Sequence, residues 1–550
     1  MRKHLQTSIL SAFLFCSLLS DAQKLKKADK ALIKDLQSHI SFLADDKLEG
    51  RRAGTKGEQL ASEYISKQFA AAGLQPKGDA GSWLQAFEIS DGKEVRPTSH
   101  FFINGNELKL NTDYFPLAFS KNSSLEAHPS IALHESGMPW FIDIDDWLVE
   151  NKDNPHFDLE DKLRQKATEI AAKGATALIV YNSSELEDKI AFNPKDRSTL
   201  AGIPVIYISK ASAKKYLSDP SASLDLKLKI ELGEKKRKGN NVVGYIDNGA
   251  PATVVLGAHY DHLGYGEDGN SMLRNNTTQI HNGADDNASG TAALIELAEM
   301  LKKSKLTANN YVFVAFSGEE LGLHGSKYFT ENPAVSISSV NYMINMDMVG
   351  RLNDSSKALT VGGIGTSPAW TSTFSTQNKY FKIKFDSSGT GPSDHTSFYR
   401  KDIPVLFFFT GLHSDYHRPG DDADKINYVG EMMIIRLIYN VIEKNNNPAK
   451  LAFTKTRETQ TTTSARFSVS MGIMPDYTYS GSGVRVDGVS EGRPAQKAGL
   501  KTGDVLIQLG EHSISSMESY MQALGKFKKG DLAKVKYKRG NETIETSVQF

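Results

Sequence analysis

The spacing of apolar residues divides the 550-residue chain into regions with different predicted secondary structure. Over residues 28–74, apolar positions recur three and four apart, which predicts helices. Over residues 101–233, short apolar runs alternate with one helical stretch at 159–175, which predicts a mostly β region. Over residues 240–444, continuous apolar runs alternate with amphipathic stretches, which predicts a sheet covered by helices on both faces.

These patterns predict an α/β fold class, with a three-layer α/β/α core that an insert interrupts. The core is expected over residues 23–100 and 234–446, and the mostly β insert over 101–233. A polar stretch at 447–464 predicts a linker, and short strand-like runs predict a further small domain over 465–550.

The first residues have the pattern of a secretory signal peptide. Two basic residues precede an apolar run from Ile9 to Leu19, and small residues follow up to Ala22. Because this run is too short for a permanent transmembrane helix, residues 1–22 are expected to be removed during export to the periplasm or outside the cell. An uncleaved N-terminal anchor is the alternative. Cleavage would remove Cys16, the only cysteine, so we expect a mature chain without disulfides or a transmembrane segment.

The balance of acidic and basic residues limits the kinds of binding partner that the sequence predicts. Lys and Arg together number 65, as do Asp and Glu, so the formal net charge is zero. Nothing in this balance predicts binding to nucleic acid or to an anionic membrane surface. The basic run at residues 233–239 is a local exception, and we expect it to be a solvated linker.

Ionisable residues follow the predicted strands of the core. His259 and Asp347 each end an apolar run, Glu319 and Glu320 follow a third, and His417 follows a fourth. Ligands collect at the carboxyl ends of strands in open α/β sheets, so we expect these side chains to lie together. Taken singly, each of these residues has an ordinary structural interpretation. Burying all of them together without a cation, however, would cost a large amount of free energy. Imidazoles and carboxylates without thiols suit zinc or a similar first-row metal.

Two adjacent carboxylates, Asp285 and Asp286, lie in the stretch "GADDNASG" at residues 283–290. Small residues allow the backbone to approach closely, and adjacent carboxylates repel one another unless a positive charge is near. We expect a metal, and two ions rather than one, to be that charge. A helix N-cap is the ordinary alternative.

Five stretches in this order, "GAHYDHLG", "NGADDNASG", "SGEELGLHGS", "NMDMVGR" and "DYHRPGD", resemble the co-catalytic zinc aminopeptidase family. That family includes secreted leucyl-type aminopeptidases and glutamate carboxypeptidase II. The resemblance implies two zinc ions per chain. It implies that His259 and Asp347 hold one zinc and that Glu320 and His417 hold the other. Asp286 would bridge the two ions.

The resemblance also implies catalytic roles. Glu319 would be the general base that takes a proton from a metal-activated water and passes it to the leaving amine. Tyr416 would donate its hydroxyl to the oxyanion. Asp261 would orient the imidazole of the first histidine ligand, and Asp421 that of the second.

The flanking regions resemble known modules. "AAKGATALIVYN" and "IPVIYIS" in the insert resemble a protease-associated domain, which either restricts access to the active site or stabilises the protein. The region 465–550 resembles a bacterial PDZ domain, whose loop at Met471, Gly472 and Ile473 would bind a peptide carboxylate through backbone N–H groups. On one face of a predicted helix, the side chains of Met517, Tyr520 and Leu524 either line the peptide groove or belong to the core.

The leading hypothesis is an exported di-zinc exopeptidase, most simply an aminopeptidase that removes N-terminal residues from peptides. A glutaminyl cyclase of the same fold uses one metal, which the five implied ligands argue against. A carboxypeptidase stays open, because no residue decides which terminus is bound. A non-catalytic peptide-binding envelope protein is the third alternative, and the presence of Glu319 argues against it.

Overall fold

The structure is a computed structural model. It describes residues 25–154, 157–196, 198–273, 277–374, 380–456, 469–476, 479, 481–489, 492–515 and 517–550. The predicted signal peptide and the later part of the predicted linker lie outside these residues. Among the described helices, none is both long enough and apolar enough to cross a membrane.

The largest sheet has nine described strands in the order β1-β11-β13-β12-β14-β17-β15-β16, with β2 paired to β11. The four strands β13, β12, β14 and β17 run parallel, and antiparallel pairs adjoin them on both sides. The strands are β1 (Gln75–Pro76), β2 (Leu84–Val95), β11 (Leu232–Ile246), β12 (Thr253–His259), β13 (Asn310–Phe316), β14 (Val340–Met346), β15 (Ala358–Gly362), β16 (Lys382–Phe385) and β17 (Val405–Phe409).

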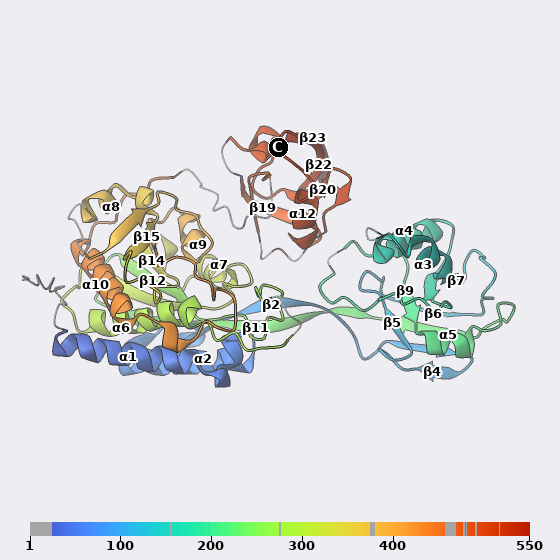
Figure 1. Cartoon of the computed structure of the whole chain (residues 1–550), viewed down its shortest axis with the longest axis horizontal. Coiled ribbons are helices and arrows are strands. Elements are labelled where there is room, and N and C mark those ends of the chain that lie inside the picture. The colour runs from blue at the N-terminus through green and yellow to red at the C-terminus, as the bar shows by residue number, and fades with distance from the viewer. Residues whose placement is uncertain are drawn as a thin grey trace, which may run out of the picture.

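Helices bury both faces of this sheet (Figure 1). On β12, Val254 and Leu256 pack in the core that includes the long helices, whereas Val255 packs in the opposite core. The first face holds α1 (Lys27–Leu43), α2 (Lys56–Ala71), α6 (Gly290–Lys302), α8 (Pro368–Thr373) and α10 (Tyr428–Lys444), and the second holds α7 (His324–Glu331) and α9 (His395–Tyr399). The predicted three-layer α/β/α core is confirmed.

The strands β2 and β11 extend beyond the sheet as a two-stranded ribbon that carries the insert (Figure 1). The basic run at 233–239 lies within β11, so the prediction of a linker is wrong, although Lys235, Lys236 and Lys238 are exposed to solvent as predicted. Acidic side chains of β2 compensate it: Lys236 Nζ is 2.6 Å from Glu88 Oε2, and Arg237 Nε is 3.0 Å from Asp91 Oδ1. These partners precede the run by more than a hundred residues, which is why the local charge pattern did not reveal a strand.

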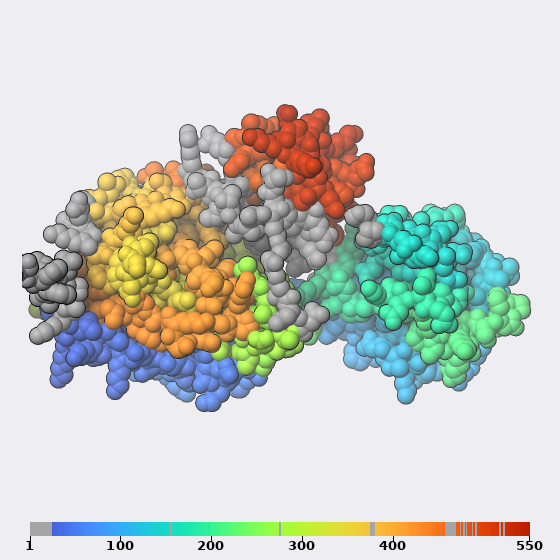
Figure 2. All heavy atoms as spheres, viewed as in Figure 1, coloured from blue at the N-terminus to red at the C-terminus, as the bar shows by residue number. Residues whose placement is uncertain are grey.

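The insert forms a separate lobe beside the core (Figure 2). It contains two four-stranded sheets, ordered β4-β3-β10-β6 and β5-β9-β8-β7. The strands are β3 (His100–Ile103), β4 (Asn106–Leu108), β5 (Tyr114–Pro116), β6 (Ser123–Ala127), β7 (Pro139–Asp143), β8 (Ala177–Tyr181), β9 (Val205–Ile208) and β10 (Leu226–Ile230). The helices are α3 (Asp145–Asn151), α4 (Leu159–Ala172) and α5 (Lys210–Tyr216).

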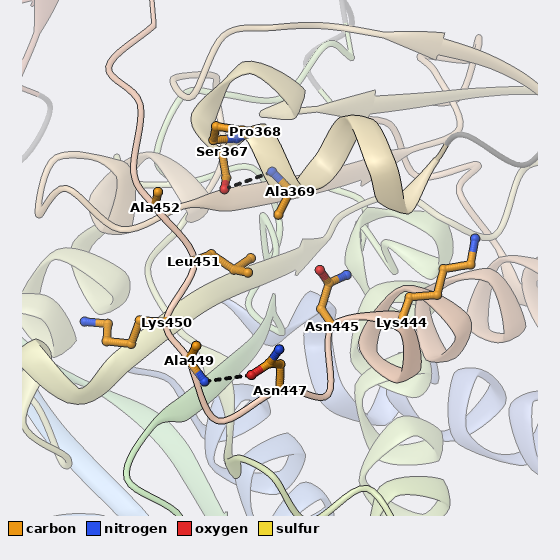
Figure 3. A pocket seen from close by; sticks show the side chains of 10 residues that line it. All are labelled: Ser367, Pro368, Ala369, Lys444, Asn445, Asn447, Ala449, Lys450, Leu451 and Ala452. Atoms are coloured by element: carbon orange, nitrogen blue, oxygen red, sulfur yellow. Dashed lines mark hydrogen bonds between the residues drawn. The ribbon is translucent and has the colours of Figure 1, made fainter.

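The chain stays on the core after α10 ends. Leu451 N donates a 2.8 Å hydrogen bond to Asn341 Oδ1, and Thr456 N donates one of 2.9 Å to the Tyr399 hydroxyl. A cavity of about 350 Å³ lies between this segment, the end of α10 and the start of α8, and no predicted site residue lines it (Figure 3). The first part of the predicted linker, residues 447–456, therefore packs on the core.

The last domain has its own hydrophobic core and a six-stranded sheet, ordered β18-β19-β20-β22-β23 with β21 paired to β20. Tyr520 and Leu524 are buried in that core, so they do not line a groove, and the side chain of Met517 lies outside the described part of the chain. The elements are β18 (Ile473–Pro475), β19 (Val484–Val489), α11 (Pro494–Lys497), β20 (Val505–Leu509), β21 (His512–Ser513), α12 (Met517–Leu524), β22 (Leu532–Arg539) and β23 (Glu542–Gln549).

Candidate functional site

The carboxyl ends of the four parallel strands carry the predicted site residues. His259 is the last residue of β12, and Asp347 follows β14 directly. Glu319 and Glu320 lie in the turn after β13, and His417 lies in the loop after β17. Neighbouring parallel strands end at the same edge of a sheet, so these four connections bring their side chains together.

Asp286 lies between two histidines. Its Oδ1 atom is 3.4 Å from His259 Nε2, and its Oδ2 atom is 3.3 Å from His417 Nε2. Asp347 Oδ1 is also 3.4 Å from His259 Nε2. Glu320 Oε2 is 3.2 Å from His417 Nε2. The two carboxylate oxygens of Asp286 therefore face different imidazoles, which is the arrangement of a ligand shared by two ions.

The other ring nitrogen of each imidazole faces a backbone carbonyl. His259 Nδ1 lies 3.2 Å from the carbonyl oxygen of Asp261, and 3.7 Å from its carboxylate Oδ1. His417 Nδ1 lies 2.9 Å from the carbonyl oxygen of Asn270. A proton on Nδ1 donates to these carbonyls and leaves the Nε2 lone pair directed at the carboxylates, as a metal ligand requires.

Asp421 acts on the backbone rather than on His417. Its Oδ2 atom accepts hydrogen bonds of 3.0 Å from the N–H groups of both Asp285 and Asp286. The prediction that Asp421 orients the His417 imidazole is wrong, because the Asn270 carbonyl occupies that nitrogen. Asp421 instead fixes the stretch from which Asp286 projects.

The stretch "GADDNASG" needs its small residues and is not a simple helix start. Gly283 has φ +56°, and a Cβ there would lie 2.1 Å from the Asp286 carbonyl oxygen and 2.5 Å from His262 Cδ2. Asp286 itself is not helical, with φ −106° and ψ 90°, and α6 begins only at Gly290. The N-cap alternative therefore does not describe Asp286.

Arg51 was not singled out by the sequence, although it lies in the loop between the first two helices. Its side chain is fully buried and donates to the carbonyl oxygens of Leu43, Tyr260, Asn282 and Gly283. Burial lowers the pKa of Arg51 to about 10, while nearby carboxylates raise it, so the guanidinium stays charged at neutral pH. It ties the loop after β12 to the stretch that carries Asp286.

His262 is a second residue that sequence reasoning missed, although it stands three positions after His259. His262 Nδ1 lies 2.8 Å from Glu320 Oε1 and 3.9 Å from Asp286 Oδ2. His417 Nε2, by contrast, lies at nearly equal distances from the facing oxygens of these two carboxylates. This geometry fits His417 as the ligand and His262 as the hydrogen-bond partner that orients Glu320.

The donor set fits a pair of divalent cations. Within each of two groups, the potential ligand atoms lie within 4.8 Å of one another: His259, Asp286 and Asp347 in one, and His262, Asp286 and Glu320 in the other. His417 Nε2 also lies beside the second group, 3.3 Å from Asp286 and 3.2 Å from Glu320, and is the better candidate ligand because His262 is paired with Glu320 Oε1. Burial lowers the pKa of His259, but the carboxylates of Glu319 and Asp347 raise it well above its usual value, which reports a strongly negative surrounding. Mixed imidazole and carboxylate ligands without thiols are those that zinc takes in catalytic sites.

The two adjacent glutamates have opposite electrostatic environments. Burial and the negative charge of Glu320 raise the pKa of Glu319 well above its usual value, although His259 opposes this. Burial also acts on Glu320, but the imidazoles of His417 and His262 hold its pKa well below its usual value. Glu320 is therefore suited to bind a cation, and Glu319 to accept a proton.

One side of the site faces solvent. The side chains of Glu319, Asp347 and His417 are 11%, 12% and 13% exposed, whereas that of His259 is 1% exposed. The Tyr416 ring stacks on the His417 ring with centroids 3.9 Å apart. Burial raises the pKa of Tyr416, so its hydroxyl keeps its proton.

In the predicted peptide-binding loop of the last domain, two side chains are buried and two backbone groups have hydrogen-bond partners within the domain. The side chains of Met471 and Ile473 are buried in the domain core. Gly472 has φ +80° and its N–H donates to Ser470 Oγ, while the Met471 carbonyl accepts from Ala495 N. The following strand β18 lies at the end of the strand order, next to β19.

Comparison with known proteins agrees with this architecture. Residues 241–442 match the family model described as peptidase family M28, and residues 459–550 match that of the PDZ domain. Aminopeptidase YwaD of Bacillus subtilis is 28% identical over 306 residues, which are 52% of this chain and 61% of that protein. An aminopeptidase of Pseudomonas aeruginosa is 32% identical over 193 residues, which are 34% of this chain and 33% of that protein.

Among solved structures, the zinc aminopeptidase BSAP from Bacillus subtilis is 21% identical, with a TM-score of 0.42 over 76% of this chain and 95% of that chain. The family matches cover the α/β core from residue 241, within β11, to residue 442, within α10, and the last domain. The chain therefore carries a domain of peptidase family M28 followed by a PDZ domain.

Proposed function

We propose that this protein is a zinc-dependent exopeptidase that removes N-terminal residues from peptides. The observation that carries the proposal is the Asp286 carboxylate, whose two oxygens face His259 and His417 at 3.4 and 3.3 Å. A carboxylate in this position can bridge two neighbouring cations, with one oxygen bound to each. The family match of residues 241–442 and the aminopeptidase names of the relatives support the same proposal.

The residues that would hold two zinc ions divide into two sets around Asp286. His259 and Asp347 would hold one ion, and Glu320 and His417 the other. Bound zinc would lower the pKa of a water molecule and so supply the nucleophile at neutral pH. The carbonyls of Asp261 and Asn270 hold the two imidazoles in the tautomer that binds metal through Nε2.

Glu319 would act as the general base. It would take a proton from the attacking water and pass that proton to the leaving amine. Its backbone N–H donates to Asp261 Oδ1 at 3.2 Å, so the residue that faces His259 also fixes the base. Tyr416, protonated and beside His417, would donate its hydroxyl to the oxyanion of the tetrahedral intermediate.

Two further parts of the proposal concern the rest of the chain. The PDZ domain would bind peptide C-termini at Met471, Gly472 and Ile473, because β18, which follows this loop, lies at the end of the strand order among the described residues and an extended peptide can pair with an edge strand. The basic start and the apolar run from Ile9 to Leu19 support export of the protein.

The proposal is tested with free-amine and N-acetylated forms of the same short peptides and the variant Glu319→Gln. We expect hydrolysis of the free-amine peptides only, and a loss of kcat of several orders of magnitude in Glu319→Gln with zinc retained. Glu299→Gln is the matched control with unchanged turnover, because the Glu299 side chain on α6 is 46% exposed and pairs with Lys303, just past the end of that helix. Equal cleavage of acetylated peptides would contradict an aminopeptidase, and unchanged turnover in Glu319→Gln would contradict the role of the base.

A further inference from the structure

Four charged side chains outside the metal centre form a compact cluster, called here the arginine clamp: Arg52, Asp91, Arg237 and Asp268. Arg52 Nε and one of its terminal nitrogens lie 2.7 and 2.8 Å from the two oxygens of Asp268. Arg237 lies 3.3 Å from both oxygens of Asp268 and 3.0 Å from Asp91 Oδ1. None of the four side chains is more than 15% exposed.

The clamp joins distant parts of the chain. Arg52 precedes α2, whereas Asp91 and Arg237 lie on the two strands of the ribbon that carries the insert. Asp268 lies in the loop of residues 264–272, which follows β12 and is part of neither α2 nor the ribbon. The insert itself reaches the same loop, because Lys195 Nζ donates a 2.8 Å hydrogen bond to the Glu267 carbonyl oxygen.

The other side of this loop contacts the metal centre. Two residues after Asp268, the Asn270 carbonyl oxygen lies 2.9 Å from His417 Nδ1, and Asn270 Nδ2 donates to the Glu320 carbonyl oxygen at 3.2 Å. Met272 N donates a 2.9 Å hydrogen bond to the His417 carbonyl oxygen. The loop therefore holds both the imidazole and the backbone of His417.

The amino-acid composition of this loop does not by itself restrict its backbone conformation. Gly264, Gly266 and Gly269 all have positive φ, at +64°, +84° and +82°. Glycine loses more conformational freedom on ordering than any other residue, so a loop with three of them needs strong contacts to stay in one conformation. The bidentate, largely buried pair of Arg52 with Asp268 is such a contact.

We propose that Asp268 is a positioning residue for the half of the metal centre formed by Glu320 and His417. Held by two guanidinium groups, it fixes the loop so that the Asn270 carbonyl keeps the His417 imidazole directed at the ion through Nε2. The other half, with His259 and Asp347, has no contact with this loop through its imidazole, because His259 Nδ1 faces Asp261. The inference rests on the proposed role of His417 as a ligand.

The test is zinc binding to Asp268→Asn, measured by competition with a chromophoric chelator in the absence of peptide. We expect one of the two zinc affinities, that of the ion held by Glu320 and His417, to fall by about ten-fold, the lower end of what outer partners of metal ligands contribute, and the other affinity to stay unchanged. Amide hydrogen exchange in residues 264–272 should become faster. Glu88→Gln breaks an exposed ion pair with Lys236 in the same ribbon and should change neither quantity.

Unchanged affinity for both zinc ions, or an equal loss for both, would overturn the proposal, since an equal loss indicates a general loss of stability. If Asp268→Asn does not fold, Arg52→Gln keeps the contact between Arg237 and Asp268 and carries the same expectation. Because no peptide is hydrolysed in this assay, failure of the aminopeptidase assignment would leave the zinc result intact. A chain that binds no zinc at all in its wild-type form would contradict the proposed function itself.

Discussion

Replacement of Arg51 by methionine tests whether the metal centre is built on a buried cation. The guanidinium donates to four carbonyl oxygens, those of Leu43, Tyr260, Asn282 and Gly283. Hydrogen bonds from a charged donor contribute about 1.5–3 kcal/mol each, so their sum is about 6–12 kcal/mol. Removing the charge recovers its desolvation cost of several kcal/mol, and we expect a net loss of about 3–5 kcal/mol.

For a domain of this size, that loss lowers the melting temperature by about 6–20 °C. Differential scanning calorimetry of the metal-free protein, with chelator present, measures the transition of the α/β core, and the PDZ transition should stay in place as an internal reference. Arg96→Met is the matched control, because Arg96 is 45% exposed and pairs only with Glu94 among the ion pairs of the described chain. A core transition of Arg51→Met within about 2 °C of the wild type would refute the reasoning.

Three further predictions follow from the site. Asp286→Asn should abolish binding of both zinc ions at neutral pH, because both halves of the metal centre share the Asp286 carboxylate. Atomic emission measures the bound zinc, and retention of one tightly bound ion would contradict a shared ligand. Tyr416→Phe should lower kcat by about 10²-fold with little change in KM, as loss of an oxyanion donor does, whereas a rise in KM alone would place its hydroxyl on the substrate ground state. Leu412 is 67% exposed on the loop that carries His417, and we expect it to contact the substrate side chain. Leu412→Ser should therefore lower kcat/KM for peptides with N-terminal leucine more than for those with N-terminal alanine. An equal effect on both peptides would contradict this placement.

The sequence predicted the core and its strand ends because local periodicity determines both. Apolar runs such as β12 are long enough to identify buried strands, and the residue that follows each run is then placed by topology. The predicted three-layer core is confirmed, and so is the PDZ domain, which the sequence indicated by resemblance rather than by periodicity. Local periodicity does not identify the residues that hold the predicted metal ligands in place.

Asn270 acts through its backbone carbonyl, which any residue carries, so no side-chain pattern reveals it. The resemblance assigns Asp421 to the His417 imidazole, but the loop turns the Asp421 carboxylate to the backbone of Asp285 and Asp286. Three of the four carbonyl partners of Arg51 lie more than two hundred residues later in the chain. His262 could have been recognised, since a second imidazole three residues after a predicted ligand is unusual.

The central claim is that Asp286 lies between two zinc ions. Anomalous diffraction at the zinc edge, from crystals of the zinc-loaded protein, measures this most directly. We predict two peaks about 3.5–4 Å apart, one beside His259 and Asp347 and one beside Glu320 and His417, with an Asp286 oxygen at each. A single peak, or two peaks with Asp286 bound to only one of them, would contradict the account.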